Sequence, residues 1–189
     1  MKSVNKIMNA EKNIYLTFDD GPTPEVTLRV LALLKEYNAK ATFFCLGKNV
    51  EQFPEIYNEI LIQGHAVGNH SYSHLNGWIT NNKKYFADVN KASVLIKSRL
   101  FRPPYGKLLP IQWFIIKKSY KIVFWTCLSK DYSEKINEEK ILYRVKKASK
   151  NNAVIVFHDT IKASKKLLNI LPEYLEFLKS ENFNCVLIK

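Results

Sequence analysis

The feature that most constrains the fold of this chain is the alternation of short apolar runs with longer amphipathic stretches. Short apolar runs rich in β-branched and aromatic residues are typical of buried strands, whereas apolar residues at intervals of three and four indicate helices. On this basis the sequence predicts strands at 13–18, 41–46, 66–69, 121–127, 153–157 and 184–188. It predicts helices at 24–37, 54–63, 83–100, 137–150 and 162–180, with Pro172 as a point where the last could break.

Strands that alternate with helices imply crossover connections and a mostly parallel sheet, so we expect an α/β fold. The chain has 189 residues, which is short for a standard eight-unit barrel of roughly 250 residues. A smaller, distorted barrel or an open parallel sheet fits this length. The chain has no internal repeat and no low-complexity linker, so we expect one domain over residues 1–189. In both arrangements active sites lie beyond the C-terminal ends of the strands.

Two adjacent carboxylates, Asp19 and Asp20, follow the first predicted strand in the segment TFDDGP. Neighbouring side chains on a strand diverge, so the two carboxylates can take different roles. The alternative is a plain turn, because Asp-Gly-Pro favours turns. The sequence thus leaves a catalytic and a structural interpretation open at this position.

Two histidines, His70 and His74, follow the strand predicted at 66–69 in the segment HSYSH. A spacing of four residues allows both rings to face one metal ion. The pair could also arise by chance, but the chain has only 4 histidines in all. This scarcity favours the interpretation as metal ligands.

Polar residues also follow the later predicted strands, and others lie in the connection between the helix predicted at 83–100 and the strand predicted at 121–127. In RPPYG the two prolines stiffen the segment, which could present Arg102 to a carboxylate and the Tyr105 backbone N–H to a cleft. Asp131 follows the strand predicted at 121–127, and His158 directly follows the buried run AVIVF, a common place for a general acid or base. The alternative for RPPYG is a plain helix-to-strand connection. The alternative for His158 is a solvent-exposed or capping histidine. Because all these strand ends would meet on one face, we expect a shared site.

The formal net charge of +12 is the composition feature that bears most on partners. Such a charge is typical of nucleic-acid binding, but only four of the 29 basic residues are arginines, namely Arg29, Arg99, Arg102 and Arg144. Arginine is the residue that base-reading sites favour, and the lysines are scattered along the sequence. We therefore predict no nucleic-acid partner and retain a weak attraction to acidic polymers.

The cysteines and the N-terminal residues indicate the cellular compartment in which the protein is expected. The 3 cysteines lie within apolar runs without metal-ligand spacing, which favours buried thiols in a reducing compartment. The first 13 residues lack an apolar stretch of signal-peptide length, and no run of about 18 apolar residues occurs anywhere. We expect a cytoplasmic chain without a membrane span; its oligomeric state is unknown.

The order of the motifs TFDDGP, HSYSH, RPPYG, the segment 125–132 and IVFHD resembles the polysaccharide deacetylase family, the NodB-homology domain of the family-four carbohydrate esterases. The motifs extend from Thr17 to Asp159, and the last predicted helix and strand fit the same domain, so the resemblance covers nearly the whole chain. The resemblance implies a distorted (β/α) barrel with about seven parallel strands. It also implies a metal-dependent hydrolase that removes N-acetyl groups from amino sugars of poly- or oligosaccharides and releases acetate.

The resemblance further implies a role for each motif residue. Asp19 is expected to be the catalytic base and Arg102 to hold it ionised. Tyr105 is expected to help bind the oxyanion through its backbone N–H, and His158 to be the general acid supported by Asp131. The metal ligands are expected to be Asp20, His70 and His74, holding a divalent ion, above all Zn²⁺, with Co²⁺ or Ni²⁺ as substitutes.

Three positions depart from the family pattern: Leu128 and Tyr132, where aspartate and tryptophan are frequent, and Val156, where leucine is frequent. They bear on the substrate and on the rate of the reaction, and not on its chemistry. Two alternatives follow. The first is the same reaction on a small or carrier-linked amino sugar, which the lack of an export signal favours. The second is a non-catalytic carbohydrate-binding protein, which loss of Asp19 or of a metal ligand would signal; neither is lost.

Overall fold

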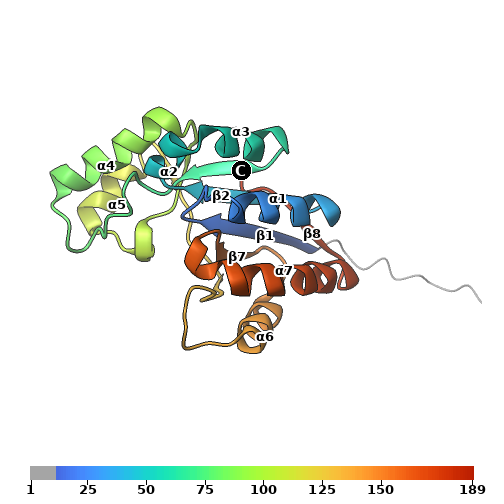
Figure 1. Cartoon of the computed structure of the whole chain (residues 1–189). Helices are drawn as coiled ribbons and strands as arrows, with labels where there is room; N and C mark the ends of the chain where they lie inside the picture. Colours follow the sequence, from blue (N-terminus) through green and yellow to red (C-terminus); the bar gives the residue numbers. More distant parts are fainter. Residues whose placement is uncertain (1–11) are drawn as a thin grey trace, which may run out of the picture.

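A curled sheet of parallel strands forms the centre of the structure, a computed structural model that describes residues 12–189 (Figure 1). Seven strands follow the order β5-β4-β3-β2-β1-β7-β6, and β8 pairs with the beginning of β1. All of these pairings are parallel. The strands are β1 (Lys12–Asp19), β2 (Ala41–Cys45), β3 (Ala66–Asn69), β4 (Leu100–Phe101), β5 (Lys121–Ile122), β6 (Cys127–Leu128), β7 (Ala153–His158) and β8 (Phe183–Cys185).

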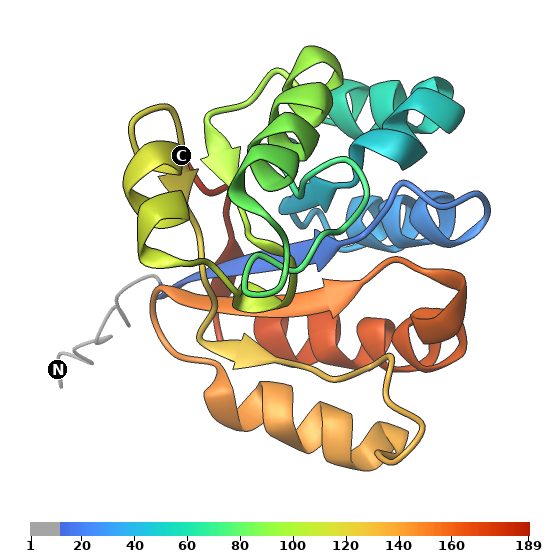
Figure 2. The same ribbon diagram turned by 90° about the vertical axis from the view of Figure 1, so that its left-hand side faces the viewer.

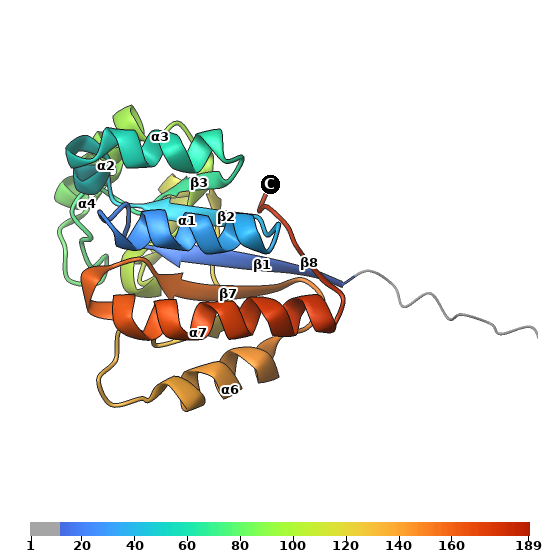
Figure 3. The same ribbon diagram turned by 45° about the vertical axis from the view of Figure 1, so that its right-hand side comes forward.

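Helices cover the outer face of this sheet. In Figure 3, α1 and α7 lie side by side over β1 and β7, whereas α6 lies at one end of the sheet and α3 and α4 lie at the other. The helices are α1 (Val26–Glu36), α2 (Gly47–Gln52), α3 (Pro54–Ile62), α4 (Asn82–Leu95), α5 (Pro110–Ile116), α6 (Glu138–Ala148) and α7 (Ile161–Ser180), with a 3-10 turn, η1, at Pro104–Gly106. None of the helices within residues 12–189 has the length and apolar character needed to cross a membrane.

The apolar runs form the central strands because both faces of these strands are covered. Every residue of β2 is buried, and its Phe43 stacks on Phe18 of β1 at 5.1 Å between ring centroids. Phe18 also stacks on Phe157 of β7 at 5.9 Å. The outer faces pack on the helices, and a smaller cluster that includes Phe44 and Leu100 fills the inside of the curl. Strands buried on both faces are expected in a parallel sheet.

The sheet curls without closing. The two-residue strands β5 and β6 stand at its two ends, and no strand pairing joins them within residues 12–189. Figure 2 shows β1 and β7 running in the same direction, so that the loops after both strands meet at one edge of the sheet. The expected distorted barrel with about seven parallel strands is confirmed.

Several predicted element boundaries are wrong, each for a local reason. The strand predicted at 121–127 is two short strands, because the carbonyls of Val123 and Phe124 accept hydrogen bonds from the Arg102 side chain instead of continuing a ladder. The helix predicted at 83–100 ends at Leu95, and Leu100 belongs to β4. Pro172 does not break α7. The short helices α2 and α5 were not predicted.

The N-terminal segment that underlies the predicted cytoplasmic location falls mostly outside the described residues. That location, and the extent of the single domain over residues 1–189, therefore stay predictions.

Candidate active site

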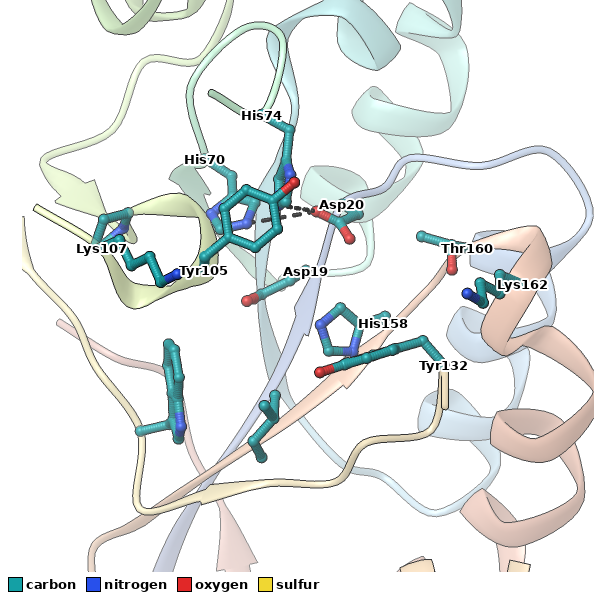
Figure 4. Close-up of a pocket in the computed structure, with 13 residues that line it drawn as sticks. Asp19, Asp20, His70, His74, Tyr105, Lys107, Tyr132, His158, Thr160 and Lys162 are labelled. Atoms are coloured by element: carbon teal, nitrogen blue, oxygen red, sulfur yellow. Dashed lines mark ion pairs between the residues drawn. The ribbon is translucent and has the colours of Figure 1, made fainter. Parts of the chain in front are cut away.

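A hollow of about 590 Å³ lies at the C-terminal ends of the strands (Figure 4). Six of the eight predicted site residues line it: Asp19, Asp20, His70, His74, Tyr105 and His158. The other two, Arg102 and Asp131, lie fully buried behind this lining. The remaining lining residues are Pro103, Lys107, Trp125, Leu128, Tyr132, Thr160 and Lys162.

The three predicted metal ligands meet at one wall of this hollow. His74 Nε2 lies 3.2 Å and His70 Nε2 lies 3.5 Å from Asp20 Oδ1, and one ligand atom from each residue lies within 4.8 Å of the other two. Asp20 Oδ1 is buried and accepts no hydrogen bond from the described residues. A buried, unsatisfied carboxylate oxygen between two imidazoles is the environment that a divalent cation would satisfy.

Both histidine rings turn their Nε2 atoms toward Asp20. Nδ1 of His70 donates to the Arg102 carbonyl at 2.7 Å, which fixes the tautomer with Nε2 free to face Asp20. Burial, together with the neighbouring His70 ring, lowers the pKa of His74 to about 4. The lowered pKa keeps the His74 ring neutral at neutral pH, and two imidazole nitrogens with one carboxylate form a donor set for a divalent cation. The residues present therefore fit a divalent metal.

Asp19 lies on the floor of the hollow and is held by the fully buried Arg102. The guanidinium donates to Asp19 Oδ1 at 2.6 Å and to Thr17 Oγ1 at 2.8 Å. It also stacks over the Phe44 ring at 4.1 Å. A charge-assisted bond of this kind is stronger than a neutral hydrogen bond and fixes the direction of the carboxylate. The predicted contact between Arg102 and Asp19 is therefore present.

His158 and Asp131 form the second charged pair of the site. Nδ1 of His158 donates to Asp131 Oδ1 at 2.8 Å. Burial opposes the charged form of the ring. The hydrogen bond and charge of Asp131, with the charges of Asp19 and Asp20, outweigh burial and raise the pKa of His158 to about 9. The imidazolium therefore persists at neutral pH, as a general acid requires.

The expected base and the expected acid occupy partnered positions on adjacent strands. Asp19 ends β1, His158 ends β7, and the two residues are register partners in the parallel ladder. Side chains at partnered positions extend to the same face of a sheet. The sheet backbone thus places the carboxylate and the imidazole side by side.

Left-handed backbone conformations are concentrated at this site. Asp20, His74 and Tyr105 have φ values of 79°, 61° and 59°. Non-glycine residues rarely adopt such φ values. These conformations occur mainly where the surrounding structure enforces them. At η1, the N–H groups of Gly106 and Lys107 donate to the carbonyls of Pro103 and Pro104, which sets the turn that carries Tyr105. The oxyanion role of the Tyr105 N–H stays a prediction.

Asp159, the last residue of the motif IVFHD, has a role that the sequence did not predict. Its fully buried carboxylate accepts from the Gly21 N–H at 3.1 Å and from Thr27 Oγ1 at 2.6 Å. A Cβ on Gly21 would lie 2.0 Å from Asp159 Oδ2. Asp159 thus anchors the loop that carries Asp19 and Asp20. The sequence near Asp159 gives no signal for this role, because its partners Gly21 and Thr27 lie 138 and 132 positions away.

The three departures from the family pattern lie in different surroundings. Leu128 and Tyr132 line the hollow, and the Tyr132 ring meets the His158 ring edge-on at 4.8 Å between centroids. Val156 is buried within β7 and does not line the hollow. Trp78, which is 58% exposed beside Lys107, does not line the hollow.

Comparison with known proteins agrees with this geometry. The sequence profile of the family described as polysaccharide deacetylase matches residues 6–119. A peptidoglycan-N-acetylglucosamine deacetylase of Bacillus cereus is 36% identical over 155 residues, which are 78% of this chain and 56% of that protein. A second Bacillus cereus protein of the same name is 31% identical over 191 residues, with 97% of this chain and 89% of that protein covered. The chain thus spans little more than half the length of the first relative.

A solved structure shows the same likeness in three dimensions. The Bc1960 peptidoglycan N-acetylglucosamine deacetylase, in complex with 4-naphthalen-1-yl-N-oxidanyl-benzamide, superposes with a TM-score of 0.87 at 32% identity. The match covers 95% of this chain and 87% of that one. The predicted family and the predicted class of enzyme, a hydrolase that removes N-acetyl groups from sugars, are confirmed. The chain belongs to the polysaccharide deacetylase family.

Proposed function

We propose that this chain removes acetyl groups from N-acetylglucosamine units of a sugar polymer or oligomer, with a divalent metal held by Asp20, His70 and His74. The observation that carries the proposal is the pair of charged groups facing one hollow: Asp19 held by Arg102, and His158 held by Asp131. The relatives described above act on the N-acetylglucosamine of peptidoglycan, as their names state. Their likeness to this chain supports a substrate of the same class.

The metal would be Zn²⁺, since two imidazole nitrogens and one carboxylate with further positions open form a set that zinc favours. When bound, the ion supplies Lewis-acid polarisation of the amide carbonyl. Co²⁺ and Ni²⁺ are accepted by the same nitrogen and oxygen donors.

The residues of the chain carry the proton transfers. The Asp19 carboxylate takes a proton from the water that attacks the acetyl carbon, and Arg102 keeps that carboxylate oriented. The backbone N–H of Tyr105 stabilises the charge that develops on the carbonyl oxygen. His158 then gives its proton to the amide nitrogen as the carbon–nitrogen bond breaks. The products are acetate and a free amino sugar.

A panel assay tests the proposal. Acetate release is measured from N-acetylglucosamine, from its oligomers of increasing length and from a polymer, with chelated and zinc-reloaded protein. We expect turnover on oligomers that is lost on chelation and restored by zinc. Turnover confined to the monosaccharide, or to a carrier-linked sugar added to the panel, would instead favour the small-substrate alternative. The cytoplasmic location remains a prediction that cell fractionation would test.

A further inference from the structure

A second hollow, of about 800 Å³, lies beside the active site along β6 and contains five positively charged side chains. Its other lining residues are mostly apolar or aromatic, and no carboxylate of the described residues lines it. We call it the basic groove, and its cations are Lys130, Lys135, Lys140, Arg144 and Lys147. All five are exposed. Four of the lysines that are scattered in the sequence, together with Arg144, are therefore gathered on this part of the surface.

The periodicity of α6 explains why cations line one side of the groove. Ile141 and Val145 are fully buried and fix which face of α6 packs on the protein. Lys140, Arg144 and Lys147 follow at intervals of four and three, so they form one stripe on the helix surface. Residues of this stripe line the groove together with residues of β6.

The groove cations lack partners of opposite charge in the described residues. Lys146, on another side of α6, pairs with Glu173 of α7 at 2.8 Å. None of the five groove cations lies within 4.0 Å of a carboxylate of residues 12–189. Cations that gather without counter-charges create a positive potential that attracts and holds anions.

The basic groove adjoins the active site. Trp125 and Leu128 belong to the linings of both hollows, so the two meet along β6. β6 is the last strand of the sheet, and Figure 2 shows it with α6 at the side of the molecule away from α4. An elongated ligand with one acetamido group beside Asp19 can therefore continue past Leu128 into the groove. Lys162, which lines the active-site hollow, adds a further cation.

We propose that the basic groove binds carboxylate groups on the same glycan chain whose N-acetyl group is hydrolysed. The inference rests on the proposed function and narrows its substrate class to anionic glycans, in contrast to neutral N-acetylglucosamine polymers. A glycan is favoured over a nucleic acid because the groove joins the deacetylase site. It also has one arginine among its five cations, and Tyr143 is the only exposed aromatic among its described lining residues.

The test compares two oligomers of equal length. One is a neutral chain of N-acetylglucosamine, and in the other every second sugar carries a carboxylate. The variant is the triple substitution Lys140→Gln, Arg144→Gln and Lys147→Gln. Kinetics are measured on the zinc-loaded enzyme, and equilibrium binding is measured in an Asp19→Asn background. We expect KM and Kd for the carboxylated oligomer to rise roughly tenfold, as for the loss of a few exposed ion pairs, with kcat unchanged. Values for the neutral oligomer should stay within about twofold.

A matched control separates the groove from net charge. The triple substitution Lys83→Gln, Lys84→Gln and Lys97→Gln removes the same charge from exposed positions on and next to α4, at the other end of the sheet. Equal effects of the two triples, or equal effects on the two oligomers, would overturn the inference, as would no effect of the α6 triple. If the wild-type enzyme releases acetate from neither oligomer, the proposed function fails, and the binding comparison still decides the role of the groove.

Discussion

Asp131 holds His158 with both of its carboxylate oxygens. Oδ1 accepts from the ring Nδ1–H and Oδ2 accepts from the backbone N–H, each at 2.8 Å. The bidentate contact fixes the ring relative to β7 as well as its charge, and Asp131 itself is fully buried. One residue thus sets the direction in which His158 can deliver a proton and the pH range in which it carries one.

Replacing Asp131 by asparagine should move the alkaline limb of the pH–rate profile. In the wild type the pKa of His158 is raised to about 9, so the acid form is retained up to that range. Asp131→Asn removes the charge that favours the imidazolium, and the limb should shift toward the ordinary value of about 6.5. The profile of kcat/KM against pH reports this directly. An unmoved limb would show that His158 is not the acid or that Asp131 does not tune it.

The two adjacent carboxylates should respond differently to substitution. Asp19→Asn should keep the metal and lose turnover by about 100-fold or more, as expected for a missing general base. Asp20→Asn should lower metal affinity, because Oδ1 of Asp20 lies between the two histidine rings. Metal content after dialysis, measured beside acetate release, separates the two effects. Equal metal loss in both variants would contradict this division of roles.

Removing Arg102 should destabilise the fold as well as the site. Its guanidinium bonds Asp19, Thr17 and two carbonyls in a fully buried position. Arg102→Ala should cost about 3–5 kcal/mol in the free energy of unfolding, since it leaves a buried carboxylate unpaired. Arg99→Ala, at an exposed position three residues earlier, should cost less than about 0.5 kcal/mol. Denaturant titration of both variants measures the difference, and a cost for Arg102→Ala as small as for the control would contradict it.

Asp159 should give metal-free protein a distinctive pH dependence of stability. Burial raises the pKa of this carboxyl to about 7 in the folded state. In the unfolded chain it is about 3.9. Between these values the folded protein binds the extra proton, so the contribution of Asp159 to stability falls as pH rises from about 4 to about 7.

The size of this effect is at most about 4 kcal/mol, at 1.36 kcal/mol for each pKa unit. The free energy of unfolding of the wild type relative to Asp159→Asn should therefore decrease over this pH range. Denaturant titrations at several pH values measure that difference. A difference that is constant with pH would show that the Asp159 pKa is not raised.

The sequence predicted the site better than it predicted the edges of the sheet. Asp19, His70 and His158 could be placed because each follows an apolar run, and parallel strands deliver their ends to one edge. The split between β5 and β6 could not be foreseen, since it depends on carbonyls that accept from Arg102, some 20 residues earlier.

Contacts between distant parts of the chain also could not be predicted from the sequence. The role of Asp159 depends on Thr27, 132 positions away, and nothing local to either residue indicates it. The basic groove gathers Lys130 and Lys147 only because α6 turns back beside β6. In the sequence these lysines cannot be distinguished from the many others.

The partnership of Asp19 and His158 across the β1–β7 ladder has a consequence for how such proteins can diverge. The distance between the backbone positions of the base and the acid is set by the separation of neighbouring strands, which is about 4.8 Å in any sheet. Loops that border the hollow, such as the one carrying Tyr132, can lengthen, shorten or change their charge without altering that spacing. Substitutions in the loops around the hollow can therefore change which glycan is bound, while the strands keep the base and the acid at the spacing that the reaction needs.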